Sequence, residues 1–219
     1  MAIARRNPNR EIEVKLRILN LPALLRELLK LGAKPRRTVL ERNTLYDTPS
    51  RGFSRRGAIL RIRTEHPAPL PGSLRRIPRA GNPPLPGFLT YKGLLPRAAN
   101  ARSRYKIREE IEYRLPNAAR FERLLRRLGL RPWFRYEKSR TRYSLPRIPG
   151  LHLDLDETPI GVFLELEGSK SAIDRAARLL GFGPGDYLPV SYLELYLAHC
   201  RRRRLKPGNM LFTSKKSSP

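Results

Sequence analysis

Apolar and charged residues alternate strictly from Glu11 to Ile18, in the order Glu-Ile-Glu-Val-Lys-Leu-Arg-Ile. A period of two predicts a β-strand with one apolar and one charged face, because successive side chains of a strand point to opposite sides. The charged face carries two carboxylates and then an ammonium group. Alone, such a face most often belongs to a strand that is exposed to solvent, but this pattern returns later in the chain.

The chain contains an internal repeat. The matched segments are 11–16 with 110–115, 24–32 with 124–129, 60–63 with 153–156, and 89–93 with 164–168. Each half therefore predicts a strand, a helix and three further strands. Eight alternating strands that are mostly sequential neighbours favour an antiparallel, closed β-barrel with flanking helices, because closure removes the exposed edges. We expect a mainly β, α+β fold built from two pseudo-repeated halves.

Four segments have helical spacing of leucines or a helix-capping pattern. Asn20 and Asn117 are suited to cap helices that begin directly after them. Ser171 with Asp174 resembles a capping box, and Ser191 is expected to cap the last helix.

The composition bounds the class of protein. Lys and Arg number 46 and Asp and Glu 19, so the formal net charge is +27. This charge predicts a polyanionic partner such as nucleic acid, nucleotides, polyphosphate or an acidic membrane surface. No apolar run is long enough to span a bilayer, and the single Cys200 excludes an internal disulfide. We expect a cytoplasmic protein with no membrane partner that could form a homodimer.

Three segments depart from the alternating pattern. Residues 66–88 contain seven prolines, which predicts a long loop between two strands, either a lid or a disordered insertion. Residues 1–9 form a basic extension, and residues 201–219 begin with four arginines and are expected to be a flexible tail. The loop and the tail could contact polyanions without specificity. The main domain is expected to span residues 10–200.

The helices need apolar surface and must lie outside the barrel, so the charged faces of the strands would line the interior. The charged positions are Glu11, Glu13, Lys15, Arg61, Arg63, Lys92, Lys138, Arg140, Arg142, Asp154, Asp156, Glu165 and Glu167. Arg and Lys suit phosphate oxygens, and carboxylates suit Mg²⁺ or Mn²⁺. Together they predict a site for a metal-bound triphosphate. The alternative is an open sheet with solvated charge pairs.

Glu11-Ile12-Glu13-Val14-Lys15 resembles the ExExK signature of the CYTH domain, the triphosphate tunnel metalloenzymes. Other segments follow in the order of that family: 46–49, 60–63, 90–93, 108–110, 138–140, 155–156 and 163–167. The resemblance covers about residues 10–200. Thr-Tyr-Lys-Gly at 90–93 and Arg-Glu-Glu at 108–110 resemble most the class IV adenylyl cyclase-like branch.

The resemblance implies an eight-stranded antiparallel tunnel with residue roles carried over from the family. It implies phosphate binding by Lys15, Arg61, Arg63, Lys92, Arg108, Lys138 and Arg140. It implies metal binding, of Mg²⁺ or Mn²⁺, by Glu11, Glu13, Asp156, Glu165 and Glu167. It implies catalytic roles for Lys15, Glu110 and Glu112.

Three functions remain open at this point. An adenylyl cyclase would convert ATP to cyclic AMP and diphosphate. A triphosphatase would hydrolyse tripolyphosphate, thiamine triphosphate or a nucleoside triphosphate. A non-catalytic protein would bind RNA or another polyanion through its basic surface. The motif resemblance favours the cyclase narrowly.

Overall fold

The computed structural model describes residues 10–68, 86–94 and 103–213. The strands are β1 (Arg10–Ile18), β2 (Lys34–Asp47), β3 (Ile59–Pro67), β4 (Gly87–Leu94), β5 (Lys106–Leu115), β6 (Arg131–Ser144), β7 (His152–Thr158) and β8 (Gly161–Glu167). The helices are α1 (Leu21–Lys30), α2 (Gly52–Arg55), α3 (Ala118–Arg127), α4 (Lys170–Leu179) and α5 (Tyr192–Arg203), with a 3₁₀ turn at Pro184–Asp186.

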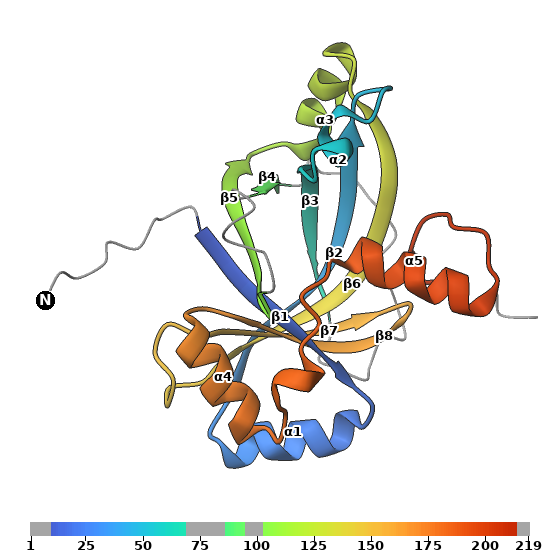
Figure 1. Ribbon diagram of the computed structural model, residues 1–219. Helices are drawn as coiled ribbons and strands as arrows, with labels where there is room; N and C mark the ends of the chain where they lie inside the picture. The colour runs from blue at the N-terminus through green and yellow to red at the C-terminus, as the bar shows by residue number, and fades with distance from the viewer. Residues whose placement is uncertain (1–9, 69–85, 95–102, 214–219) are drawn as a thin grey trace, which may run out of the picture.

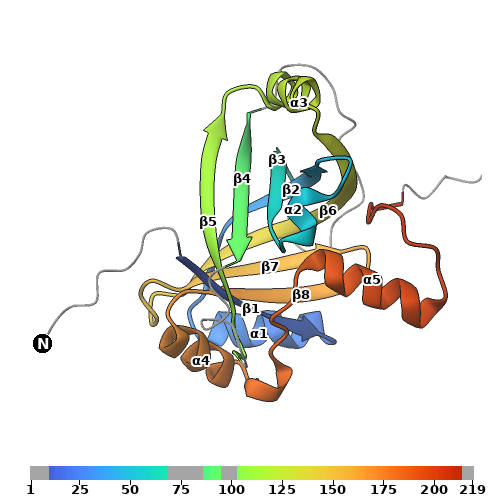
Figure 2. The ribbon, with the colours of Figure 1, turned by 45° about the horizontal axis from the view of Figure 1, so that its top comes forward.

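The eight strands form a closed antiparallel barrel in the order β1-β5-β4-β3-β2-β6-β7-β8, as Figure 2 shows. The ring of strands has two-fold pseudo-symmetry. Exchanging β1 with β5, β2 with β6, β3 with β7 and β4 with β8 gives the same neighbours around the closed ring. The structure therefore confirms the predicted barrel and its two pseudo-repeated halves.

The apolar face of each strand points outward, toward the helices. Val14 and Leu16 of β1 are fully buried in one cluster with Leu28 of α1 and Ile173 of α4. Figure 1 shows α1 and α4 together at one end of the barrel and α3 at the other. Under α3, Ile62 of β3 belongs to a second apolar cluster. Since the helices cover the apolar side, the alternating charged residues face inward.

A third apolar cluster joins α5 to inward-facing residues of the barrel. Phe163 lies in this cluster with Tyr192 and Leu195 of α5 and Met210. The N–H of Met210 donates to Arg135 O at 2.9 Å, so the chain beyond α5 runs alongside β6. The prediction that residues 201–219 are a flexible tail is therefore wrong for residues 201–213, because a buried methionine follows the arginines.

Other local predictions need correction as well. β3 runs to Pro67 and β4 begins at Gly87, so the predicted loop of residues 66–88 is shorter at both ends; residues 69–85 lie outside the described part, as does the extension 1–9. The cap of α4 is Ser169, whose side chain accepts from Ala172 N, rather than Ser171. The short helix α2 was not predicted.

Within the residues that the structure describes, no helix has the length and hydropathy that crossing a membrane requires.

Asp47 organises the turn between β2 and α2. Its carboxylate is 1% exposed and accepts hydrogen bonds from the N–H groups of Thr48, Phe53 and Ser54 at 2.8, 2.9 and 3.0 Å. The Ser54 hydroxyl donates a further one at 2.6 Å. Burial alone would raise the pKa of Asp47, but these hydrogen bonds outweigh it and hold the pKa below its usual range.

We expect Asp47→Asn to lower the free energy of unfolding at pH 7 by about 2 kcal/mol, because it weakens charge-assisted hydrogen bonds. A carboxylate with a lowered folded-state pKa stabilises the fold above its unfolded pKa of about 3.9, and this contribution disappears as the pH falls through the folded value. Urea unfolding of both proteins should show a difference that shrinks below about pH 4. A difference that stays constant with pH would contradict this role.

Candidate active site

The inward faces of the strands enclose a cavity of about 270 Å³ with a lining of mixed charge. Its charged residues are eight basic, Lys15, Arg61, Arg63, Lys92, Lys106, Lys138, Arg140 and Arg142, and seven acidic, Glu11, Glu13, Glu110, Glu112, Asp154, Glu165 and Glu167. The chain as a whole carries +27. A nearly neutral lining therefore leaves almost all of the excess positive charge outside the cavity.

On one side of the cavity, the acids of β1 meet lysines of β1, β4 and β5. Lys15 Nζ lies 2.9 Å from Glu13 Oε1, and Glu13 also contacts the ammonium group of Lys106. Lys92 Nζ lies 2.7 Å from Glu11 Oε1. Because β1 lies between β5 and β8, its charged side chains reach partners on both sides.

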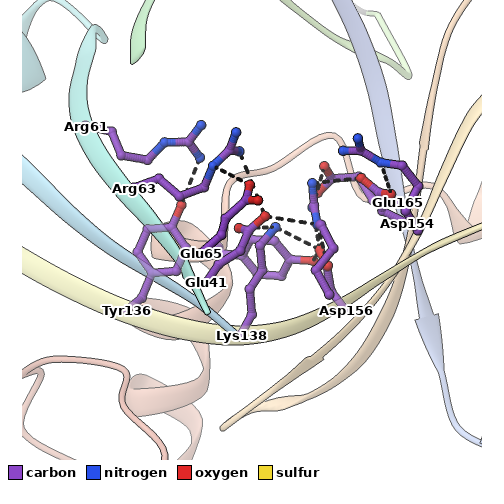
Figure 3. Close-up of polar contacts among 12 residues, drawn as sticks. Glu41, Arg61, Arg63, Glu65, Tyr136, Lys138, Asp154, Asp156 and Glu165 are labelled. Atoms are coloured by element: carbon purple, nitrogen blue, oxygen red, sulfur yellow. Dashed lines mark hydrogen bonds and ion pairs between the residues drawn. The ribbon is translucent and has the colours of Figure 1, made fainter. Parts of the chain in front are cut away.

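On the other side, Asp156 is fully buried and holds the cations of β6 (Figure 3). Its Oδ2 accepts from Lys138 at 3.0 Å, from Arg140 at 2.6 Å and from the Tyr192 hydroxyl at 2.6 Å. Arg140 also donates to Glu165 Oε1 at 2.9 Å. These bonds restrict the directions in which the ammonium and guanidinium groups can point.

The third part of the lining consists of two arginines of β3. Arg61 donates to the Tyr136 hydroxyl at 3.3 Å and to Thr90 Oγ1 at 3.1 Å. Arg63 donates to Glu112 Oε1 at 3.1 Å. Among the described residues, Arg61 Nε has no hydrogen-bond partner, so this guanidinium retains a donor for an anionic ligand.

Three groups of the lining have pKa values near neutrality. Burial, together with the charge of Glu13, raises the pKa of Glu11 to about 7, although Lys92 opposes the shift. Burial and the neighbouring Glu11 raise the pKa of Glu167 to about 8. Burial lowers the pKa of Lys106 to about 8 despite the opposing charge of Glu13. These groups are suited to gain or lose a proton at physiological pH.

The acids that were expected to bind metal lie mainly on β1 and β8, where Glu13 is opposite Glu167 and Lys15 is opposite Glu165. Across the ranges that the structure describes, no three carboxylate, imidazole or thiol groups converge as metal ligands. The donor set nevertheless fits Mg²⁺ or Mn²⁺ chemically, because these ions take oxygen ligands and would offset both the burial and the repulsion by Glu13 that raise the pKa of Glu11. In this structure the acids of β1 pair with lysines, Glu13 with Lys15 and Lys106 and Glu11 with Lys92.

Two of the residues given roles by the resemblance do not line the cavity. Arg108 instead donates to Gly57 O at 3.4 Å, in the connection before β3. Asp156 lies behind the lining, where it contacts cations that do reach the cavity. All the others are brought together in the lining: Glu11, Glu13, Lys15, Arg61, Arg63, Lys92, Glu110, Glu112, Lys138, Arg140, Glu165 and Glu167.

The sequence analysis missed several residues of the site. Lys106 shares the inward face of β5 with Glu110 and could have been found from the alternation. Glu41 is 1% exposed, and its Oε2 lies 3.4 Å from Lys138 Nζ. The sequence does not reveal it, because Glu41 and Arg42 are adjacent charged residues and break the alternation of apolar and charged positions. Tyr192 directly follows the predicted cap Ser191, and no sequence pattern places it inside the barrel.

Comparison with known proteins identifies the family. Residues 9–180 match the model of the CYTH domain. The chain belongs to the CYTH family. This match confirms the resemblance drawn from the ExExK signature, and it ends before α5, which begins at Tyr192.

The CYTH chain aligns with nearly the whole length of two relatives. A protein of Methanocaldococcus jannaschii named "Putative adenylate cyclase MJ0240" is 28% identical over 195 residues, 84% of this chain and 97% of the relative. The PH1819 protein of Pyrococcus horikoshii OT3 is 26% identical with a TM-score of 0.63, covering 86% of this chain and 99% of that one.

A plant structure shares the fold at lower identity. It is described as "Putative adenylyl cyclase HpAC1 from Hippeastrum reveals a dominant triphophatase activity". Its identity is 19% and its TM-score 0.54, over 86% of this chain and 96% of that one.

We expect Glu41→Gln to destabilise the barrel by about 3 kcal/mol, because it removes a buried counter-ion of Lys138, Arg140 and Arg63. The matched control is Glu27→Gln, which breaks the exposed 2.7 Å pair with Lys30 and should cost less than about 1 kcal/mol. Chemical denaturation of the two variants measures both values. Equal losses would show that Glu41 is not electrostatically important.

Proposed function

We propose that this CYTH protein is a divalent-metal-dependent enzyme that acts on a triphosphate held in its barrel. The observation that carries the proposal is the presence of eight cations and seven carboxylates in the lining of one cavity of about 270 Å³. Ligand cavities usually have about 300–1,000 Å³. A space just below this range suits a triphosphate group, and a nucleoside attached to it would extend out of the cavity.

The cations of the lining have distinct parts in this proposal. Lys15 is held between Glu13 and Glu165; burial opposes its charge, but the two carboxylates raise its pKa above the usual range. Lys15 therefore acts as a fixed positive charge rather than as a base. Arg61 and Arg140, with planar guanidinium groups, are suited to bind phosphate oxygens in pairs.

Glu11, Glu13, Glu165 and Glu167 would hold Mg²⁺ or Mn²⁺ in the proposed enzyme. The bound ion supplies neutralisation of the phosphate charge. Asp156, in this proposal, contributes indirectly, by fixing Lys138 and Arg140.

The reaction that we propose first is that of a class IV adenylyl cyclase. The ribose 3′-oxygen of ATP would attack the α-phosphorus, the bond from that phosphorus to the bridging oxygen would break, and diphosphate would leave. The hydroxyl proton needs an acceptor. Glu11 and Glu167 belong to the proposed metal set, whereas Glu110 does not. Burial would raise the pKa of Glu110, but Lys92 and Arg61 lower it, so its carboxylate is ionised and able to accept the proton. The name of the Methanocaldococcus jannaschii relative supports the cyclase reaction.

The second candidate is a triphosphatase, in which water attacks the terminal phosphorus and gives its proton to a carboxylate of the lining. The bond from that phosphorus to the bridging oxygen breaks, diphosphate or a nucleoside diphosphate leaves, and the attacked phosphoryl group becomes orthophosphate. The description of the Hippeastrum protein favours it. The small cavity also supports it, because this reaction needs no ordered nucleoside.

A product assay tests the proposal directly. Purified protein is incubated with ATP or with tripolyphosphate, in Mg²⁺ and in Mn²⁺, and the products are separated by chromatography. We expect cyclic AMP with diphosphate from ATP. ADP with orthophosphate, and turnover of tripolyphosphate, would support the triphosphatase. Turnover of neither would contradict both reactions with these substrates and favour either a polyanion-binding protein or an enzyme for another organic triphosphate, such as thiamine triphosphate.

We expect Glu165→Gln to reduce metal-dependent kcat/KM by about 100-fold or more, because it removes a carboxylate of the proposed metal set. Circular dichroism should show an unchanged fold, and calorimetry should show weaker Mn²⁺ binding. The Glu27→Gln variant on α1 serves as the control, since its charge change is remote from the cavity. Full activity with unchanged Mn²⁺ affinity would contradict the assignment.

A further inference from the structure

Tyr192 is a part of the cavity that comes from outside the segment matched to the family. The match ends at residue 180, whereas Tyr192 is the first residue of α5 and lines the cavity with Ser191 and Leu193. Two devices hold it there. Ser191 and Glu194 form a capping box, and Leu188 pairs with the backbone of Lys15 through hydrogen bonds of 3.2 and 2.9 Å. The segment before α5 is therefore hydrogen-bonded to Lys15, whose ammonium group lies near the ring of Tyr192.

The hydroxyl and the ring of Tyr192 contact different charged groups. The hydroxyl donates to Asp156 Oδ2 at 2.6 Å, the same oxygen that accepts from Lys138 and Arg140. The ring centroid lies 5.0 Å from Lys15 Nζ and 4.9 Å from Lys138 Nζ. An ammonium group near the face of an aromatic ring is attracted by the quadrupole of the ring. One side chain thus restrains both lysines and the carboxylate that binds one of them.

The surroundings keep the ring in one orientation. Tyr192 is 6% exposed, and its ring meets the edge of Phe163 at a centroid distance of 5.7 Å and an interplanar angle of 78°. If this side chain only packed against Phe163 and Leu195, a leucine or phenylalanine at position 192 would serve equally well. A buried tyrosine needs a hydrogen-bond partner, and here the partner is a charged group of the site.

We propose that Tyr192 is a positioning residue, through which the C-terminal helix orients Lys15, Lys138 and Asp156 for the phosphate chain of the substrate. This inference rests on the proposed function, because it assumes that the two lysines bind a triphosphate. The helix is then a component of the phosphate site as well as a closure of the barrel.

Two substitutions separate the hydroxyl from the ring. Tyr192→Phe removes the hydrogen bond to Asp156 and keeps the ring, while Tyr192→Leu removes both. The matched control is Tyr196→Phe, one turn later on α5, where the hydroxyl accepts from Gly208 N at 3.1 Å and donates to Asn209 O at 3.3 Å, remote from the cavity. Each of the two Phe variants removes one hydroxyl group from the same helix, α5, so they differ only in whether the hydroxyl lies at the cavity.

Calorimetric titration with tripolyphosphate, in the absence and presence of Mg²⁺, gives a readout that is independent of turnover. We expect Tyr192→Phe to weaken binding and to raise KM by about tenfold with a smaller change in kcat, because a charge-assisted hydrogen bond is lost. Tyr192→Leu should weaken binding further, and Tyr196→Phe should leave affinity and KM unchanged. Thermal unfolding of each protein accompanies the titrations.

Each outcome decides between roles. Unchanged affinity and KM in Tyr192→Phe, with a loss of thermal stability only, would overturn the positioning role and leave a structural one. Equal losses of affinity in the variants at 192 and 196 would overturn it as well, because the effect would then come from the helix as a whole. Absence of tripolyphosphate and ATP binding by the unchanged protein would overturn the proposed function together with this inference.

Discussion

Burial of ionised groups of both signs inside the barrel is the constraint on which the structure depends. Glu13, Lys15 and Asp156 are each 2% exposed or less, and an isolated charge in such surroundings is strongly destabilising. Every one of them is therefore held by opposite charges from neighbouring strands. Closure of the barrel is what makes this compensation possible, because it brings the second half of the chain to β1 on both sides.

Much of this arrangement could be predicted from the alternation of residues. In a strand, a period of two separates an apolar face from a charged one, and the need to cover Val14 and Leu16 with helices directs Glu13 and Lys15 inward. The prediction fails where the period is broken or where the site depends on distant segments. Glu41 is followed by another charged residue, and Tyr192 reaches the cavity only because a helix beyond the repeat packs on Phe163. No local pattern records that contact.

The errors at element ends have local physical causes. Ser169 and Ser171 are both good capping residues, and the two hydroxyls lie 3.1 Å apart; Asp174, which resembled the end of a capping box, instead accepts from the hydroxyls of Tyr105 and Tyr187. Most of the side chains that the resemblance selects line the cavity, but Arg108 does not. Its long side chain instead reaches the carbonyl of Gly57.

The strand order has a consequence for how the chain acquires its fold. β1 pairs only with β5 and β8 among the described strands, so it finds no partner strand within its own half. Its last partner, β8, ends at Glu167. Contacts between residues so distant in sequence form late and slowly, because a long loop must close before they are made. The ion pair between Lys15 and Glu165 needs β8, so we expect closure of the barrel and completion of the charge network around Lys15 to be a single event.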